Sequence, residues 1–457
     1  MKKSWWFSLC ALLVIVAMLV PVARAADPEF DWKQEAGKTL TLILVRHSYT
    51  DAMTPYFPQF EELTGITLKY DVLSEEEYRE KLLIDLSTGA GTYDIFMTGP
   101  VSNWQYAPAG WIEPLDKYIE DPKLTSPDWD FADFWPSLIA ASRWNMTPGS
   151  GIGEGSLWAL PVNEEGYALF YRKDLFEAKG IKVPETYQEL YETAKMLNGT
   201  EWDGKKIAGF VARGNRSWPT IHTGYGSMFW TYGGRDFDEN FKCTINSDIG
   251  VAVTELWGKI MSETAPEDVI NYTWYEAQEA FAAGKAAMFI DADHMAEAFE
   301  NPQKSQVTGK VGYAAPPKGP NGEPPKTNLW VWSIAMSAAS KNKNAAWLWL
   351  QWASSKDILT RTAVKGNINP CRISVANSPE VAEYMKNWGD YQKTYIYLLD
   401  KVVGLNWAPM KEQSEVGDRW AVAVQEVILG ARSAQDALNA AAAEIDKMVE
   451  AAGYIKK

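Results

Sequence analysis

The chain has 457 residues, with 59 acidic and 44 basic side chains, which gives a net charge of −15 at pH 7. A chain of this length is too long for a single hydrophobic core and suits two or three domains. A strongly acidic protein without a basic block argues against nucleic acid and anionic membranes as partners. The same acidic balance argues against a highly anionic ligand.

The first 25 residues are typical of a secretory signal. Lys2 and Lys3 give a charged start, an apolar run extends from Leu9 to Val20, and Ala23-Arg24-Ala25 supplies a small-residue cleavage site. The apolar run has about 12 residues, whereas a membrane span needs roughly 20. We therefore expect cleavage after Ala25 and a periplasmic protein of 432 residues, whose charge becomes −18 once the three basic residues are removed.

Two cysteines, Cys243 and Cys371, remain after cleavage. In an oxidising compartment they could pair, or they could stay as two separate buried thiols, and the sequence leaves both open. The three histidines, His47, His222 and His294, are scattered singly and show no zinc-binding spacing. We therefore expect neither a metal nor a cofactor.

The region after the signal alternates between strand and helix patterns. Strands are predicted at 40–44, 66–72 and 94–97, with helices between them that end at Gly65 and Gly89. This order predicts a parallel sheet with crossover helices. Small molecules bind beyond the carboxyl ends of such strands, here at residues 46–51 and 98–104.

The segment 157–181, LWALPVNEEGYALFYRKDLFEAKGI, reads as a strand that leaves one domain and enters another. Polar residues 163–165 stand at the crossover. A second strand, 286–290, closes with Asp291-Ala292-Asp293, another plausible crossover, and a third strand rich in tryptophan follows at 329–336. Small-molecule clefts tend to form between domains, so we expect one at these crossovers.

Tryptophan is abundant, with 22 residues in the chain. An indole face is a rigid apolar platform that suits the C–H-rich face of a sugar. For any one of these residues a core position is the better interpretation, but as a group they favour a ligand cleft. Those near the predicted loops and strand ends are Trp104, Trp218, Trp230, Trp330 and Trp332.

Four carboxylates, Glu164, Glu165, Asp291 and Asp293, stand at the first two crossovers. A hydrolase would use two of them as an acid and base or nucleophile, a binding protein would use them to accept hydroxyl donors, and some could simply be solvated loop charges. Arginines could add bidentate donors, although each alone is more often a surface residue. The candidates are Arg213, Arg216 and Arg372. The chain contains no Gly-x-Ser-x-Gly and no His-Glu-x-x-His, which argues weakly against an enzyme.

Five blocks together resemble the extracellular solute-binding proteins (family 1) of bacterial ABC importers, especially those for sugars and polyols. They are KLLIDLSTGAGTYDIFMTG with GWIEPLD (81–116), WALPVNEEGYALFYRKDLFEAKGI (158–181), FAAGKAAMFID (281–291), LWVWSIAMSAASKNK (329–343) and NPCRIS (369–374). The order and spacing of the blocks are specific, although no single block is. The resemblance covers essentially the whole mature chain.

The resemblance implies an α/β fold of the periplasmic-binding-protein type, with two α/β lobes joined by three hinge crossovers near 161–165, 290–293 and 330–332. We accordingly expect a signal peptide at 1–25, an N-terminal lobe of 26–162 plus 292–330, and a C-terminal lobe of 163–291 plus 331–457.

The resemblance also implies the ligand-binding residues. Glu165 looks like the crossover acid of polyol-type relatives, and the pocket loops of the first lobe would be 47–51 and 99–104. His47 and Ser48 stand where polyol binders often carry amides. The complete set of candidates is His47, Asp51, Gly99, Trp104, Glu164, Glu165, Arg213, Trp218, Trp230, Asp291, Asp293, Trp330, Trp332 and Arg372.

The function implied is that of a monomeric periplasmic protein, not an enzyme, that closes around a neutral sugar or polyol and delivers it to the inner-membrane permease subunits of an ABC importer. A secreted glycoside hydrolase with the same aromatic cleft is the alternative from another class. A third hypothesis keeps the two-lobed fold and gives it a peptide or organic-acid ligand.

Overall fold

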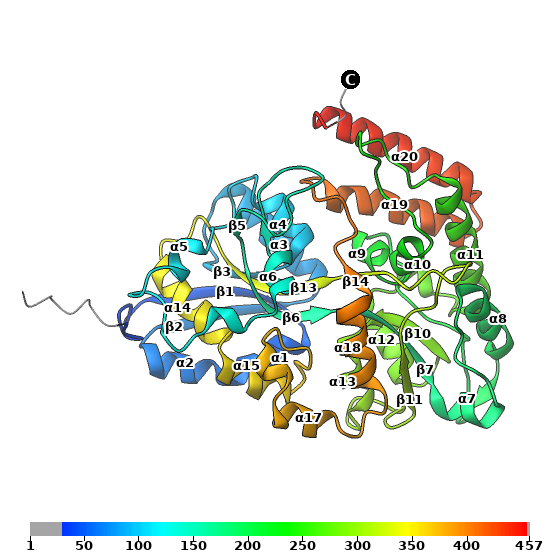
Figure 1. Cartoon of the computed structure of the whole chain (residues 1–457), viewed down its shortest axis with the longest axis horizontal. Helices are drawn as coiled ribbons and strands as arrows, with labels where there is room; N and C mark the ends of the chain where they lie inside the picture. Colours follow the sequence, from blue (N-terminus) through cyan, green and yellow to red (C-terminus); the bar gives the residue numbers. More distant parts are fainter. Residues whose placement is uncertain (1–29, 455–457) are drawn as a thin grey trace, which may run out of the picture.

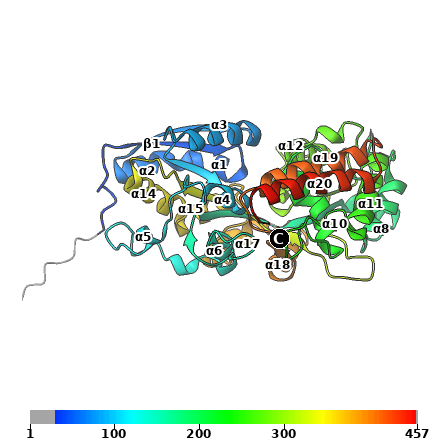
Figure 2. The same cartoon turned by 90° about the horizontal axis from the view of Figure 1, so that it is seen from above.

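The computed structural model describes residues 30–454, so the predicted signal peptide lies outside the described residues. Two α/β lobes lie side by side, with residues near the N-terminus in one and the C-terminal helices in the other (Figure 1). From above, the same two bodies remain distinct (Figure 2). Within residues 30–454, no helix combines the length and the apolar character that crossing a membrane requires.

The first lobe is built on a five-stranded sheet of order β2-β1-β3-β13-β6. β1, β2 and β3 are parallel, as the alternation predicts, and β13 runs antiparallel to both β3 and β6. Its strands are β1 (Thr39–Val45), β2 (Thr67–Leu73), β3 (Ile95–Thr98), β13 (Trp330–Met336) and β6 (Leu160–Glu165), with a separate pair β4 (Arg143–Trp144) and β5 (Ser156–Leu157).

Helices pack around this sheet, and their ends follow the sequence signals. Gly65 ends α2 and Gly89 ends α3, both at positive φ, the left-handed conformation that favours glycine. The helices are α1 (Ser48–Met53), α2 (Phe57–Thr64), α3 (Glu75–Thr88), α4 (Pro100–Tyr106), α5 (Asp116–Ile119), α6 (Pro136–Ala141), α14 (Lys343–Ala353), α15 (Lys356–Ala363) and α16 (Ile373–Ala376), with short turns η1 (Thr54–Tyr56) and η2 (Phe131–Asp133).

The second lobe centres on the antiparallel sheet β10-β7-β11. Its strands are β7 (Tyr167–Arg172), β10 (Met288–Ala292) and β11 (Val311–Ala314), and the short pairs are β8 (Glu201–Trp202) with β9 (Lys205–Lys206) and β12 (Thr327–Asn328) with β14 (Val403–Gly404). Its helices are α7 (Lys173–Lys179), α8 (Tyr187–Leu197), α9 (Trp218–Thr220), α10 (Gly226–Thr231), α11 (Asp248–Thr264), α12 (Trp274–Ala282), α13 (Ala296–Glu300), α17 (Pro379–Met385), α18 (Tyr391–Lys401), α19 (Gln413–Ile428) and α20 (Ala434–Ala451), with η3 (Ile221–Tyr225), η4 (Val269–Asn271) and η5 (Asp293–Met295).

The strand pairing corrects the expected lobe boundaries. β11 pairs with β7 in the second lobe, so most of 292–330 does not belong to the first lobe. β13 pairs with β3, and α14, α15 and α16 pack in the first lobe as well, so 331–376 does not belong to the second. Both errors have one cause, because periodicity identifies a strand without identifying its partners. The expected crossover at 290–293 is likewise wrong, since the chain there continues within the second lobe.

The third crossover follows α16, the last helix assigned to the first lobe, and residues 367–371, just before that helix, lie beside the first crossover. Asn367 Nδ2 donates to the carbonyl of Val162 at 3.0 Å, and Asn369 Nδ2 donates to the carbonyl of Glu164 at 3.1 Å. These amides satisfy backbone carbonyls of β6 where it leaves the first lobe. The other two crossovers, at residues 165–167 and 328–330, run next to each other, and the segment 367–371 is bonded to the first of them.

Both remaining cysteines are free thiols in buried positions. Burial raises the pKa of Cys243 to about 12 and raises that of Cys371 well above its ordinary value. The structure thus favours the second of the two alternatives that the sequence left open.

Arg372 was expected to contact a ligand, and this expectation is wrong. Its side chain is fully buried in the first lobe, where it donates to the carbonyls of Ser354 (2.6 Å), Asp130 (2.7 Å) and Trp129 (2.8 Å). The guanidinium also lies 4.1 Å from the ring centre of Phe134. Arg372 therefore holds the loop before α6 to the end of α14.

We predict that Arg372→Met lowers the free energy of unfolding by at least about 3 kcal/mol, because three carbonyls, two of them buried, lose their donor. Urea denaturation followed by tryptophan fluorescence measures the loss. The matched control is Lys386→Met, which removes a cation that is 55% exposed and should change stability by no more than about 0.5 kcal/mol. Equal effects of the two substitutions would contradict the structural role of Arg372.

Candidate functional site

A cleft with an inner and an outer part lies between the lobes. The inner pocket has a volume of about 20 Å³, and the outer part has about 760 Å³. Both lobes contribute to the inner pocket, whose lining residues are His47, Glu75, Arg79, Glu165, Tyr167, Arg213, Trp218, Pro219, His222, Trp274, His294, Met295, Trp330 and Trp332. In this arrangement the inner pocket has room for about one water molecule, so a larger guest would hold the lining residues of the two lobes further apart.

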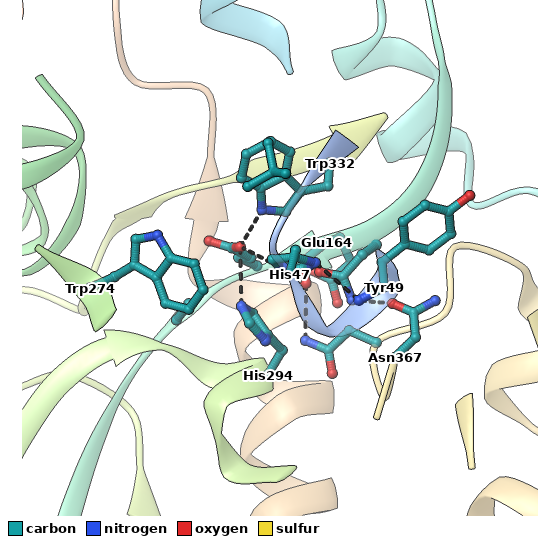
Figure 3. A network of polar contacts seen from close by, with 12 residues as sticks. His47, Tyr49, Glu164, Trp274, His294, Trp332 and Asn367 are labelled. Atoms are coloured by element: carbon teal, nitrogen blue, oxygen red, sulfur yellow. Dashed lines mark hydrogen bonds and ion pairs between the residues drawn. The ribbon is translucent and has the colours of Figure 1, made fainter. Parts of the chain in front are cut away.

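The carboxylate of Glu165, at the end of β6, is the centre of the inner pocket. Trp332 Nε1 donates to Oε1 at 2.7 Å, and His294 Nε2 lies 3.1 Å from the same oxygen. His47 Nε2 is 3.6 Å away (Figure 3). Burial alone would raise the pKa of Glu165, but the charge and hydrogen bond of His294, together with the nearby His47, hold it well below its usual range. Glu165 is therefore a permanent anion that accepts hydrogen bonds.

The two histidines beside Glu165 differ in charge. Burial lowers the pKa of His47, so this side chain is neutral. Burial opposes the charge of His294 too, but the negative charge of Glu165 and the hydrogen bond to it raise its pKa above the ordinary value. The pair His294–Glu165 is thus a buried ion pair between a residue of the second lobe and one at the hinge.

The nearest ligand atoms of His47, Glu165 and His294 lie within 4.8 Å of one another, a spacing that could also suit a metal ion. The hydrogen bond made by His47 argues against this use. Its Nδ1 accepts from the backbone N–H of Tyr49 at 3.1 Å, which caps α1 and assigns the proton to Nε2. A metal on Nε2 would require a proton on Nδ1, facing that N–H. The geometry favours a hydrogen-bonding group instead.

Arg213 stands on the second lobe and is fixed by Asp291. Nε and Nη2 of Arg213 donate to the two carboxylate oxygens at 2.8 and 2.5 Å. Burial would lower the pKa of Arg213, but Asp291 raises it, so the guanidinium stays charged. These two bonds leave the Nη1 hydrogens of Arg213 for another acceptor in the pocket.

Aromatic rings form the walls. The ring of Trp330 lies 5.3 Å from that of Trp218 and 5.4 Å from that of Trp332, so the planes enclose the pocket from several directions. Gly99 makes this position possible, because a Cβ there would sit 2.4 Å from the Trp330 ring. His222 lies beside Trp330, and burial lowers its pKa to about 3, so it is neutral.

Comparison with known proteins identifies the scaffold. A family model described as bacterial extracellular solute-binding protein matches residues 47–358. The chain belongs to this family. It is 32% identical over 414 residues to an erythritol/L-threitol-binding protein of Mycolicibacterium smegmatis, covering 88% of this chain and 84% of that protein.

Solved structures of solute-binding proteins show the same architecture. A protein from Agrobacterium radiobacter in complex with ribitol aligns with a TM-score of 0.80 and 28% identity, covering 91% of this chain and 99% of that one. A protein from Agrobacterium vitis with bound D-mannitol aligns with a TM-score of 0.79 and 26% identity, covering 92% and 100%. The two-lobed fold expected from the sequence is thereby confirmed.

In this solute-binding protein, six of the candidate residues line the inner pocket: His47, Glu165, Arg213, Trp218, Trp330 and Trp332. Asp291 and Gly99 stand directly behind Arg213 and Trp330. Three other candidates lie elsewhere. Asp51 is exposed on α1, Trp104 is buried against Trp144 in the first lobe, and Trp230 is buried against Trp407 and Trp420 in the second.

Glu164 and Asp293 face the hinge and not the pocket. Neighbouring residues of a strand point to opposite sides, so Glu164 must point away from the side that Glu165 occupies. Burial and the nearby charge of Asp293 raise the pKa of Glu164 well above its usual range. Burial raises the pKa of Asp293 to about 7, and Asn369 Nδ2 donates to its Oδ1 at 2.8 Å.

Sequence reasoning missed eight residues of the lining: Glu75, Arg79, Tyr167, Pro219, His222, Trp274, His294 and Met295. His294 directly follows a candidate acid, and this adjacency was an available signal. Glu75 and Trp274 each begin a helix, and nothing local in the sequence brings two residues 199 positions apart together.

We predict that His294→Gln destabilises the protein more at pH 6 than at pH 9.5. Because the folded-state pKa of His294 is raised, its ion pair contributes fully below the unfolded pKa of about 6.5 and is lost as the pH rises through the folded value. Breaking this buried pair should cost about 3 kcal/mol at pH 6. Urea denaturation at both pH values measures the two differences.

His222→Gln is the matched control, because the stability difference between wild type and this variant should change with pH in the opposite direction. The pKa of His222 is depressed when folded, so wild-type stability falls relative to this variant as the pH drops below about 6.5. A difference between wild type and His294→Gln that does not change with pH would contradict the assigned charge of His294.

Proposed function

We propose that this protein is the periplasmic capture subunit of an ABC importer, and that it closes its lobes around a short neutral polyol. The observation that carries the proposal is the inner pocket, where Glu165 and Trp332 of the first lobe face Arg213 and Trp218 of the second. The indole faces suit C–H groups, while the carboxylate accepts hydroxyl protons and the guanidinium donates to hydroxyl oxygens.

The balance of charge in the pocket supports a neutral ligand. Glu165 is paired with His294, Arg213 with Asp291, and Arg79 with Glu75, whose Oε1 lies 2.5 Å from Nη2. An anionic guest would therefore find no unpaired cation among the described lining residues, and a cationic one no unpaired carboxylate. This pattern disfavours the organic-acid hypothesis, which requires unpaired arginine.

The relatives support the same ligand class. The proteins named above bind erythritol or L-threitol, ribitol and D-mannitol, all of which are acyclic polyols. We extend this class to the present chain on the basis of its own Glu165, Arg213 and tryptophans. Delivery to inner-membrane permease subunits, cleavage of the signal peptide and action as a monomer complete the proposal.

Binding without chemistry is the better interpretation of the acids. A retaining or inverting glycosidase needs one carboxyl group that holds a proton at neutral pH. Glu165 remains ionised, and Asp291 is held in a bidentate pair with Arg213. Among the candidate acids, Glu164 and Asp293 have a raised pKa, and both lie at the hinge, away from the inner pocket. Burial also raises the pKa of Asp418, which lines only the outer part of the cleft.

Isothermal titration of the purified mature protein with erythritol, ribitol, mannitol and glucose tests the proposal. We expect at least one polyol to bind and to be recovered chemically unchanged by chromatography. Binding of none of the four, or turnover of any of them, would contradict it.

We predict that Arg213→Met weakens polyol binding at least tenfold, because a charge-assisted donor to the ligand is removed. Lys386→Met, which removes an exposed cation, serves as the control and should bind like wild type. Titration of both variants with the best wild-type ligand measures the effect. If Arg213→Met binds the ligand as tightly as wild type, the ligand does not contact Arg213.

A further inference from the structure

Two buried carboxyl groups at the hinge take no part in the inner pocket. Glu164, near the end of β6, is 0% exposed, and Asp293, at the start of η5, is 1% exposed. Both carboxylate oxygens of Glu164 and Oδ2 of Asp293 have no hydrogen-bond partner among the described residues. Removing an unpaired carboxylate from water costs free energy, and a carboxyl group that keeps its proton avoids this cost.

The two acids stand on opposite sides of the bend between the lobes. Glu164 is fixed in the first sheet, where it pairs with Val331 of β13. Asp293 belongs to the second lobe, because it directly follows β10, which pairs with β7. Its backbone N–H donates to the carbonyl of Gly166 at 2.9 Å, and a Cβ on Gly166 would sit 3.5 Å from its Oδ2. A rotation of the lobes about the crossover at 165–167 therefore changes the relative position of the two carboxyl groups.

Asn369 connects the two sides of this bend. Its Nδ2 donates to the backbone carbonyl of Glu164 at 3.1 Å and to Oδ1 of Asp293 at 2.8 Å. The hydroxyl of Tyr391 donates to Oδ1 of Asn369 at 2.6 Å, which fixes the orientation of the amide. This amide satisfies one carboxylate oxygen of the pair and leaves the other three without a donor.

The groups that face the pair do not compensate a second negative charge. They are Glu165 on β6, His294 on η5, Tyr391 and Tyr395 on α18, and Cys371 beside the hinge. Burial keeps the pKa of both tyrosines and of Cys371 well above the ordinary values, so these groups are neutral between pH 7 and pH 9. His294 is already paired with Glu165. Burial raises the pKa of Asp293 to about 7, although the charge of His294 opposes this rise.

We propose that Glu164 and Asp293 share one proton while the lobes are together, and that loss of this proton at alkaline pH favours an open hinge and weakens ligand binding. This inference rests on the proposed function. With one proton the pair carries a single negative charge, whereas without it two buried like charges lie near each other. Lobe opening separates the acids and admits water, so the closed form holds the proton more tightly and ligand binding takes up protons.

Titration calorimetry at pH 7 and pH 9, with the polyol that wild type binds best, tests this link. The affinity of wild type should fall about tenfold more than that of Glu164→Gln, which corresponds to about one unit of pKa difference between the open and closed forms. Glu164→Gln keeps the shape of the side chain and removes its charge. His294 loses its proton in alkaline solution in both proteins, so its contribution cancels in the comparison.

Glu383→Gln is the matched control, because it removes an acid that is 70% exposed. Its affinity should change with pH as that of wild type does. Infrared difference spectroscopy of wild type between pH 7 and pH 9 gives a second measurement that needs no variant. The carbonyl band of a protonated carboxyl group should decrease as the pH rises, while a carboxylate band grows.

The outcomes separate this inference from the proposed function. If wild type binds no polyol, the proposed function fails, and the infrared bands alone decide whether the pair holds a proton. If wild type binds a polyol and its affinity changes with pH in the same way as that of Glu164→Gln, the inference is overturned. It is also overturned if no protonated-carboxyl band decreases between pH 7 and pH 9.

Discussion

The buried carboxylate of Glu165 is the constraint on which the architecture of the cleft depends. A charge removed from water is tolerated only where partners compensate it, and Glu165 obtains these partners from both sides of the hinge. Trp332 belongs to the first lobe and His294 to the second. Because the acid stands where β6 leaves the first sheet, the same group that can hold a hydroxyl also responds to the relative position of the lobes.

The remaining charges of the pocket follow the same logic. Arg213 is oriented by Asp291 and Arg79 by Glu75, so each arginine that lines the inner pocket has its own anionic partner. His47 is kept neutral by burial and by the hydrogen bond that its Nδ1 accepts from the backbone N–H of Tyr49. Directed donors and acceptors without net charge, surrounded by tryptophan, are the surface that recognises a neutral hydroxylated molecule.

The local features of the fold could be predicted from the sequence, because alternation and glycine caps act over a few residues. The three parallel strands, the ends of α2 and α3, and the crossover at Glu165 were all predicted in this way. The lobe assignment after residue 291 could not be, since it depends on which strands β11 and β13 pair with. The five-block resemblance gave the order of elements but not these partners.

The site shows the same division between local and long-range information. Residue type and position identified Glu165, Arg213 and Trp330. The face of β6 on which Glu164 lies depends on how the side chains alternate along that strand. Trp104, Trp230 and Arg372 carry suitable chemistry and are nevertheless used in packing, as is usual for large side chains in a core. The Glu75–Trp274 contact joins two helix starts from different lobes, and only the tertiary structure brings them together.

A crystal structure of the mature protein with erythritol tests the central claim most directly. The account predicts one intact molecule between the lobes, with hydroxyl groups within hydrogen-bond distance of Glu165 and Arg213 and its carbon chain against Trp218 or Trp330. A ligand that lies only in the outer part of the cleft, without contact to Glu165, would contradict it.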